Sequence, residues 1–223
     1  KNGYQRVKVD GQFYELDEPP AVRVEQEHQK AQAIAQIFDT MKAKPLAIGA
    51  ALPKSNQVLK SVDGKDLRLN DAAGEKGTLI IFTCNHCPFV KAWDTRIAAL
   101  ANAAKLKGIG VLALNPNDPK TFGDDDFKTM QARAKELALQ YPYAVDAKSA
   151  LAKTFGATRT PEIFLFDAQK SLVYHGTIDD NSRDASAVQN HYLKNAIAAL
   201  LQGQKPNPAQ TKALGCSIKF YQD

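Results

Sequence analysis

The sequence predicts an α/β protein with a central mixed sheet flanked by helices and an N-terminal extension. Strand-like and helix-like segments alternate from about residue 48 to residue 201. Residues 78–83 (TLIIFT) form an apolar run of strand length, which is typical of a buried central strand. With 44% hydrophobic and 24% charged residues, the chain has the composition of a globular protein that can bury a substantial core.

The first 45 residues differ in pattern from the rest of the chain. Residues 7–9 and 12–14, joined by Asp10-Gly11, have the form of a short hairpin. After Pro19-Pro20, residues 24–41 predict a polar helix with one apolar side, which Lys44-Pro45 would end. We therefore expect an extension over residues 1–45, made of a hairpin and a helix, and a main domain over residues 46–223.

The first half of the main domain predicts a hairpin, a buried strand and a long helix. Residues 58–60 and 67–69 flank an Asp63-Gly64 turn. The strand at 78–83 follows. Beyond it, apolar residues recur at helical spacing until Gly108, which stands where a helix C-terminal cap belongs; they are Phe89, Trp93, Ile97, Leu100 and Ala104.

The second half continues the alternation of strands and helices. A helix is expected from about Asp125 to Leu139, opening on acidic residues as the helix dipole prefers. The last helix is expected at about 185–201 and ends before Gly203. The remaining expected segments are strands at 110–115, 143–145, 163–166 and 172–174 and a helical turn at 147–155.

Charge and apolar pattern exclude several classes of partner. The net charge is +5, but Lys and Arg are dispersed with no basic run, so we expect no nucleic-acid partner. No apolar run approaches the roughly 20 residues that a membrane-spanning helix needs, so we expect a soluble protein without membrane insertion. Three cysteines are too few for a disulfide scaffold. The pattern makes no prediction of the oligomeric state.

The sequence starts at Lys1 with neither an initiator methionine nor an apolar signal stretch. Removal of a targeting segment would produce such a start and predicts a periplasmic or secreted protein. A trimmed chain would produce it as well, which leaves a cytoplasmic location open.

The stretch Cys84-Asn85-His86-Cys87-Pro88 follows the buried strand directly. Pro88 fits only the first turn of a helix, so we expect Cys84 at or near the N-cap and Cys87 on the first turn. The spacing of three brings both thiols within reach of a disulfide. The free N–H groups and positive dipole end of the helix favour a thiolate on Cys84, and a partly protonated His86 would lower its pKa further. We predict a redox dithiol that needs no metal and no organic cofactor.

From about Ile48 to its end, the chain resembles the thioredoxin superfamily, in the redoxin branch grouped with alkyl hydroperoxide reductase/thiol-specific antioxidant proteins. Four motifs of that branch stand here in order. They are C-N-H-C-P at 84–88, G-A-x-x-T-P-E at 156–162, Y-x-G-x-I-D-D at 174–180 and G-C-S-I-K at 215–219.

The resemblance implies a thioredoxin-like fold and a role for each motif. Cys84 would be the nucleophile and Cys87 the resolving thiol. Thr160-Pro161 would be the cis-proline turn that faces the dithiol and holds an extended substrate segment. The activity implied is thiol–disulfide exchange with a dithiol or disulfide protein partner or with a small thiol.

Two positions depart from thioredoxin itself, which has a tryptophan just before the first cysteine and a buried aspartate six residues before it. Thr83 and Thr78 stand at these positions here. The usual proton acceptor for Cys87 is therefore missing, and we expect Glu162 or Asp94 to take its place.

Three other functions remain as alternatives. Phe82-Thr83 and Cys87-Pro88 are similar to the reactive site of a peroxiredoxin, a thiol-dependent peroxidase. That site also needs a Thr or Ser three residues before the reactive cysteine and a proline seven before it, which neither cysteine has. Zinc is disfavoured because a structural site takes four ligands and only Cys216, His175 and His191 could complete one. A non-catalytic binding module would leave the C-x-x-C pair without a purpose.

Cys216 lies near the C-terminus and allows two interpretations. Free cysteines are among the most buried residues, so Cys216 could serve packing alone. It could also be a third redox thiol that receives the disulfide from the C-x-x-C pair. Ile218 and Phe220 make the segment apolar enough to dock on the domain, and a disulfide would require the Cα atoms to lie within about 7 Å.

Overall fold

The computed structural model describes residues 6–9, 12–15, 24–27, 29–30 and 44–221, and the chain divides into two units, 1–42 and 43–223. In the smaller unit, β1 (Arg6–Val9) pairs antiparallel with β2 (Gln12–Glu15), which confirms the hairpin. Its Asp10-Gly11 turn lies outside the described residues. Residues 24–27 and 29–30 are helical; the remainder of the helix expected at 24–41 also lies outside them.

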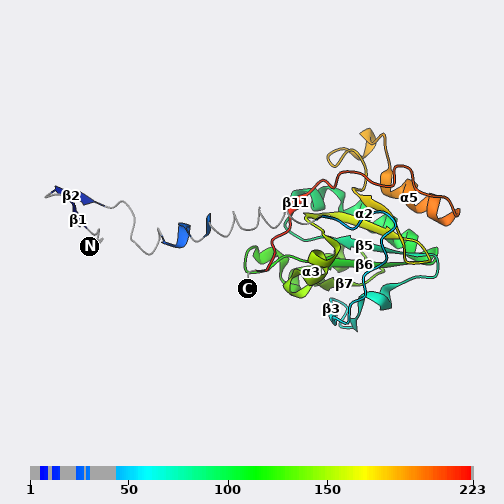
Figure 1. Ribbon diagram of the computed structural model, residues 1–223, viewed down its shortest axis with the longest axis horizontal. Helices are drawn as coiled ribbons and strands as arrows, with labels where there is room; N and C mark the ends of the chain where they lie inside the picture. The colour runs from blue at the N-terminus through cyan, green and yellow to red at the C-terminus, as the bar shows by residue number, and fades with distance from the viewer. Residues whose placement is uncertain (1–5, 10–11, 16–23, 28, 31–43, 222–223) are drawn as a thin grey trace. The chain divides into compact units, whose positions relative to one another are not determined.

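The larger unit is built on a seven-stranded sheet in the order β10-β9-β5-β6-β7-β3-β4 (Figure 1). The central strands β5, β6 and β7 are parallel, and β9 joins β5 antiparallel, so the sheet is mixed as expected. The strands are β3 (Leu59–Ser61), β4 (Asp66–Leu67), β5 (Gly77–Phe82), β6 (Ile109–Asn115), β7 (Tyr143–Val145), β9 (Glu162–Phe166) and β10 (Leu172–Gly176).

Helices cover both faces of this sheet because successive side chains of β5 point to opposite sides. Leu79 and Ile81 pack in a core with α2 (Pro88–Leu106), α3 (Phe127–Glu136) and α5 (Tyr192–Leu201). Ile80 and Phe82 pack in a second core with α4 (Ala150–Phe155) and the C-terminal segment. All six residues of β5 are buried, which confirms the central strand predicted from TLIIFT.

The predicted starts of two helices were wrong for local reasons. The last helix begins at Tyr192, and only a 3₁₀ turn, η4 (Ala185–Ala187), precedes it. The Asp180 carboxylate accepts the backbone N–H groups of Gln189 and Asn190, which holds that stretch outside the helix. The helix expected from Asp125 begins at Phe127, because the Asp126 carboxylate caps it by accepting the N–H of Thr129 at 2.7 Å. Asp125 is left in the preceding turn, η2 (Gly123–Asp125).

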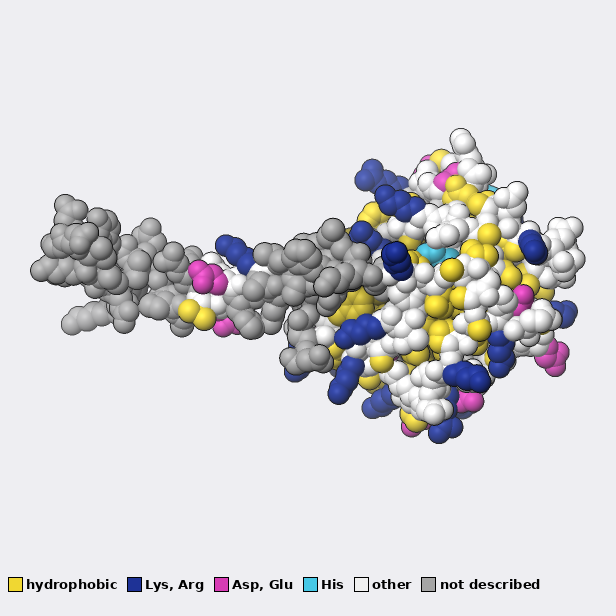
Figure 2. Space-filling view, viewed as in Figure 1, with side chains coloured by type: hydrophobic (Ala, Val, Ile, Leu, Met, Phe, Trp, Pro, Cys, Tyr) yellow, Lys and Arg dark blue, Asp and Glu magenta, His cyan; other side chains and the backbone are white. Residues whose placement is uncertain are grey.

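The C-terminal segment returns to the domain as β11 (Cys216–Ser217), which pairs antiparallel with β8 (Arg159–Thr160). Ile218 and Phe220 are buried in the second core, which confirms that the segment docks. The face in Figure 2 carries Lys and Arg side chains scattered among the others, in agreement with their dispersal along the sequence. Among the described residues, the helices are too short or too polar to cross a membrane.

Candidate functional site

The loop of residues 83–87 joins β5 to α2 and carries two cysteines. Cys87 is the N-cap of α2 and Pro88 its first helical residue. The helix was expected to begin at or near Cys84 with Cys87 on its first turn; the cap is instead Cys87 itself, three residues after Cys84 and one before the first turn. Proline is favoured at the first helical position, where its missing N–H is not needed, so the cap falls on the residue just before it.

The loop at Thr160-Pro161 covers the two thiols. Its peptide bond is cis, as the resemblance implied. The Thr160 hydroxyl lies 3.1 Å from Cys84 Sγ, and the Thr160 carbonyl oxygen lies 3.2 Å from Cys87 Sγ. Cys84 is 1% exposed, and Cys87 and Thr160 are fully buried. The structure thus brings these predicted site residues together in a closed environment.

Cys216 belongs to the same cluster of thiols. Its Sγ lies 2.7 Å from Cys87 Sγ, although the two residues are 129 positions apart in the sequence. Cys216 is partly exposed, whereas Cys84 and Cys87 are buried, and all three are free thiols. Cys87 is therefore the middle sulfur of the cluster, in contact with Cys216 on β11 and hydrogen-bonded to Cys84.

The electrostatic surroundings favour the thiolate on Cys87. A hydrogen bond from the Cys84 thiol, helped by the Cys216 thiol and the Val90 N–H in the first turn of α2, lowers the pKa of Cys87 to about 5. Burial opposes this effect without outweighing it. The N-cap position adds the positive end of the α2 dipole, the environment in which cysteines become reactive.

The prediction that Cys84 has the lowered pKa was wrong. Its hydrogen bond to Cys87, its burial and the negative charge of Asp125 all raise the pKa of Cys84. Burial, followed by the contact with Cys87, raises the pKa of Cys216 to about 11. These pKa shifts favour the thiolate on Cys87 over either of its two neighbours.

His86 acts on a carboxylate rather than directly on Cys84. Its Nδ1 lies 2.5 Å from the Asp125 carboxylate, and its ring stacks on Phe122 with the centroids 4.1 Å apart. Asp125 is buried and also accepts the N–H of Asn85 at 2.6 Å and the amide of Asn117 at 2.8 Å. His86 is therefore paired with a carboxylate, and the negative charge of Asp125 offsets the effect that a positive charge on His86 would have on the thiols.

Asp125 is the site residue that the sequence did not reveal. It stands in an acidic run that also contains the helix cap Asp126, and no spacing links it to His86, 39 positions earlier. Within the described part of the chain, ligand atoms of Cys84, His86 and Asp125 lie within 4.8 Å of one another, a set of types that zinc accepts. The carboxylate already has four hydrogen-bond partners, since the Asn115 amide also donates to it at 3.4 Å.

Neither carboxylate expected to serve Cys87 has that role in the structure. The Glu162 carboxylate accepts the backbone N–H groups of Thr158 and Arg159, both at 2.8 Å, and lies 2.8 Å from His175 Nε2. Asp94 is paired with Arg133. In residues 44–221, neither one hydrogen bonds to a cysteine. Glu162 instead anchors the loop that covers the thiols.

A small cavity of about 30 Å³ lies beside Cys84 and is also lined by Asn85, Asp94, Arg133 and Tyr143. The Tyr143 hydroxyl donates a hydrogen bond to the Asn85 side chain at 3.1 Å. A space of this size can hold a water molecule, which needs about 10–15 Å³. Asp94 therefore faces the Cys84 side of the dithiol across this cavity, and not the Cys87 side.

Comparison with known proteins agrees with this geometry. The Redoxin family model matches residues 47–191, which is more than half of the chain. The chain belongs to the Redoxin family. The domain defined by this match contains both C-x-x-C cysteines and the cis-proline loop, whereas Cys216 lies beyond it.

Similar proteins extend the comparison over most of the chain. A hypothetical protein from Sinorhizobium meliloti 1021 shares 30% identity over 81% of this chain and 98% of its own, with a TM-score of 0.73. An uncharacterized conserved protein from Geobacillus kaustophilus shares 34% identity over 79% and 94%, with the same TM-score. The thiol-disulfide oxidoreductase ResA of Bacillus thuringiensis subsp. konkukian is 26% identical over 132 residues, which cover 59% of this chain and 70% of ResA.

These findings confirm the thioredoxin-like fold, since a thioredoxin-like protein is among the solved structures that share it, and they confirm the Redoxin family that the sequence resembles. Together with the similarity to ResA, the family indicates an oxidoreductase with a redox function.

Proposed function

We propose that this chain is a thiol–disulfide oxidoreductase in which Cys84 and Cys87 alternate between a dithiol and a disulfide. The observation that carries the proposal is the hydrogen-bonded thiol pair at the N-terminus of α2, in which the pKa of Cys87 is lowered to about 5. The name of the relative ResA supports the same activity. The partner is a dithiol or disulfide protein or a small thiol, and the chemistry needs neither a metal nor an organic cofactor.

The reaction is a two-step thiol–disulfide exchange. A thiolate of the pair attacks a partner disulfide, one sulfur bond of the partner breaks, and a mixed disulfide forms. The second thiol loses its proton and attacks the mixed disulfide, which closes the Cys84–Cys87 bond and releases the partner as a dithiol. Two electrons pass to the partner, and the reverse sequence oxidises it. The resemblance assigns the first attack to Cys84, whereas the lowered pKa favours Cys87.

The test equilibrates a Cys216→Ser variant in glutathione redox buffers, so that only the proposed pair can form an internal disulfide. Trypsin releases residues 77–91, which contain both cysteines, as one peptide. We expect a reversible loss of two hydrogens from this peptide, which an additional Cys84→Ser or Cys87→Ser change abolishes. A folded Cys216→Ser protein whose peptide keeps two free thiols in every buffer would refute the proposal.

A further inference from the structure

We propose that β11 is a tethered strand that presents Cys216 to Cys87 as a second disulfide partner. The disulfide then passes between Cys84–Cys87 and Cys87–Cys216. The inference rests on the proposed function, because it uses the same Cys87. It adds a third redox thiol from outside the matched Redoxin domain.

The sulfur positions are already close to those of a bonded pair. Cys216 Sγ and Cys87 Sγ are 2.7 Å apart, compared with about 2.05 Å in a disulfide. Cys216 lies opposite Thr160 in the β8–β11 pair, and Thr160 is the residue whose hydroxyl and carbonyl contact Cys84 and Cys87. The same strand pair that holds β11 therefore aligns its cysteine with the dithiol.

Gly215 allows β11 to approach the cis-proline loop this closely. A Cβ at this position would lie 2.2 Å from the Thr160 carbonyl oxygen and 2.6 Å from its carbonyl carbon. Both are backbone atoms, so they cannot rotate away as a side chain could. Glycine at position 215 thus lets the strand lie beside Thr160, and Cys216, the next residue, places its thiol against Cys87.

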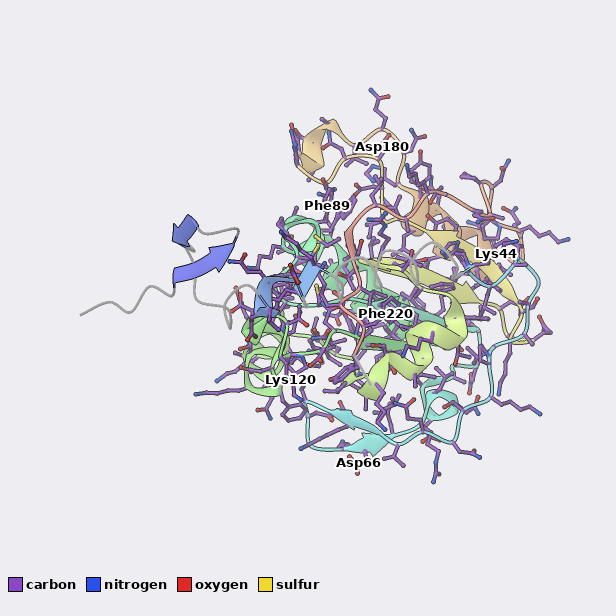
Figure 3. The ribbon with its side chains drawn as sticks, turned by 60° about the vertical axis from the view of Figure 1, so that its left-hand side comes forward. Lys44, Asp66, Phe89, Lys120, Asp180 and Phe220 are labelled. Carbon is purple, nitrogen blue, oxygen red and sulfur yellow. The ribbon has the colours of Figure 1, made fainter. Side chains whose placement is uncertain are left out.

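The segment after Cys216 is firmly attached to the domain (Figure 3, where Phe220 of this segment is labelled). The Ile218 N–H donates to the Thr158 carbonyl at 3.0 Å, and the Lys219 N–H donates to the Asn117 side chain at 2.8 Å. Ile218 and Phe220 are buried. Cys216 is therefore held at the dithiol by the pairing of β11 with β8 and by the contacts of the residues that follow it.

The exposure of the three thiols assigns the outward position to Cys216. Cys84 and Cys87 are buried, whereas Cys216 is partly exposed. Because β11 occupies the edge of β8, an outside polypeptide cannot pair with Thr160 while β11 is in place. A partner thiol thus meets Cys216 before it meets the buried pair.

The exchange needs no added oxidant or reductant. Starting from the Cys84–Cys87 disulfide, the Cys216 thiolate attacks Cys87 Sγ; the new bond forms, the old bond breaks, and Cys84 takes up the proton that Cys216 lost. A dithiol partner then attacks Cys216 Sγ, and Cys87 leaves as its stable thiolate. The second thiol of the partner closes the partner's disulfide and releases Cys216, so two electrons have entered the protein.

The first test removes Cys84 so that only the proposed bond can form. Trypsin releases Cys216 in the peptide of residues 213–219. After oxidation of Cys84→Ser with oxidised glutathione, we expect this peptide to be joined to 77–91 and both remaining thiols to be lost. Cys84→Ser with Cys216→Ser should not form the link. If folded Cys84→Ser keeps Cys87 and Cys216 unlinked in buffers that oxidise the wild type, the inference is wrong.

The second test moves the strand while it keeps the thiol. The variant is Gly215→Ala in the Cys84→Ser background. Its new Cβ would lie 2.2 Å from the Thr160 carbonyl oxygen, so β11 must move until the two atoms are at least 3.4 Å apart, the distance of ordinary packing. A displacement of about 1 Å can cost about 100-fold in rate, so we expect the link to form about 100-fold more slowly. Gly123→Ala is the matched control, since a Cβ there meets nothing within 4 Å. Equal rates for the two alanine variants would refute the tethered strand.

The third test concerns the route to the partner. Oxidised wild type and oxidised Cys216→Ser are reduced with glutathione, and the loss of the internal disulfide is followed over time. We expect reduction of Cys216→Ser to be severalfold slower, and equal rates would overturn the outward position of Cys216. The proposed function is tested separately, by formation of the Cys84–Cys87 disulfide in Cys216→Ser. If that disulfide forms but this test or the Cys84→Ser test fails, only the role of Cys216 is refuted.

Discussion

The Cys84 thiol is the largest stabiliser of the Cys87 thiolate, so its removal should raise the pKa of Cys87. The change that isolates this hydrogen bond is Cys84→Ala, made in a Cys216→Ser background so that one thiol remains. A hydrogen bond to a charged group contributes about 1.5–3 kcal/mol. One pKa unit corresponds to about 1.4 kcal/mol, so the loss is worth about 1–2 units. From the starting pKa of about 5, we expect a value of about 6–7 in the alanine variant.

The assay follows thiolate absorbance at 240 nm as the pH is lowered, with the fraction folded checked at each pH by circular dichroism. Cys84→Ser is the matched control, because its hydroxyl still donates a hydrogen bond and should hold the pKa of Cys87 close to its starting value. A shift below about half a unit in Cys84→Ala would refute the hydrogen-bond argument. A low-pKa thiolate that persists in Cys87→Ser would show that Cys84 is the thiolate.

Four further outcomes are expected. The reduction potential of the Cys84–Cys87 pair, measured against glutathione in Cys216→Ser, should be about −230 to −120 mV because the Cys87 thiolate stabilises the reduced form; a value near or below about −270 mV contradicts this. Glu162→Ala should lower the free energy of unfolding in urea by about 3–5 kcal/mol, because it leaves buried His175 and two backbone N–H groups without their partner. A loss no larger than that of Glu162→Gln would argue against the pairing. Asp125→Asn, in a Cys87→Ser background, should lower the pKa of Cys84 because it removes a nearby negative charge. The pKa is read from the rate of alkylation by iodoacetamide as a function of pH, and an unchanged pKa would show that Asp125 does not act on Cys84. Hydrogen peroxide should be consumed slowly with a dithiol donor, and rapid turnover that survives Cys84→Ser but not Cys87→Ser would favour a thiol-dependent peroxidase.

The order of strands and helices could be predicted because it depends on local pattern. The apolar run at 78–83 and the helical spacing from Phe89 to Ala104 are properties of neighbouring residues, and the structure has a strand and a helix at both places. The errors lie at helix ends, where one side chain decides the boundary. The carboxylates of Asp126 and Asp180 set the starts of α3 and α5 by accepting particular N–H groups.

The sequence by itself determined that this protein has a dithiol at the start of a helix, because a buried strand, C-x-x-C and Pro88 are contiguous. Only the tertiary structure shows the surroundings that favour the thiolate on Cys87 over Cys84. The charge that raises the pKa of Cys84 comes from Asp125, 41 positions along the chain (125 − 84), and the neighbour that contacts Cys87 is Cys216, 129 positions away. Hydrogen bonds and Coulomb interactions depend on distances in space, and chain folding brings together groups whose spacing in sequence carries no sign of their contact.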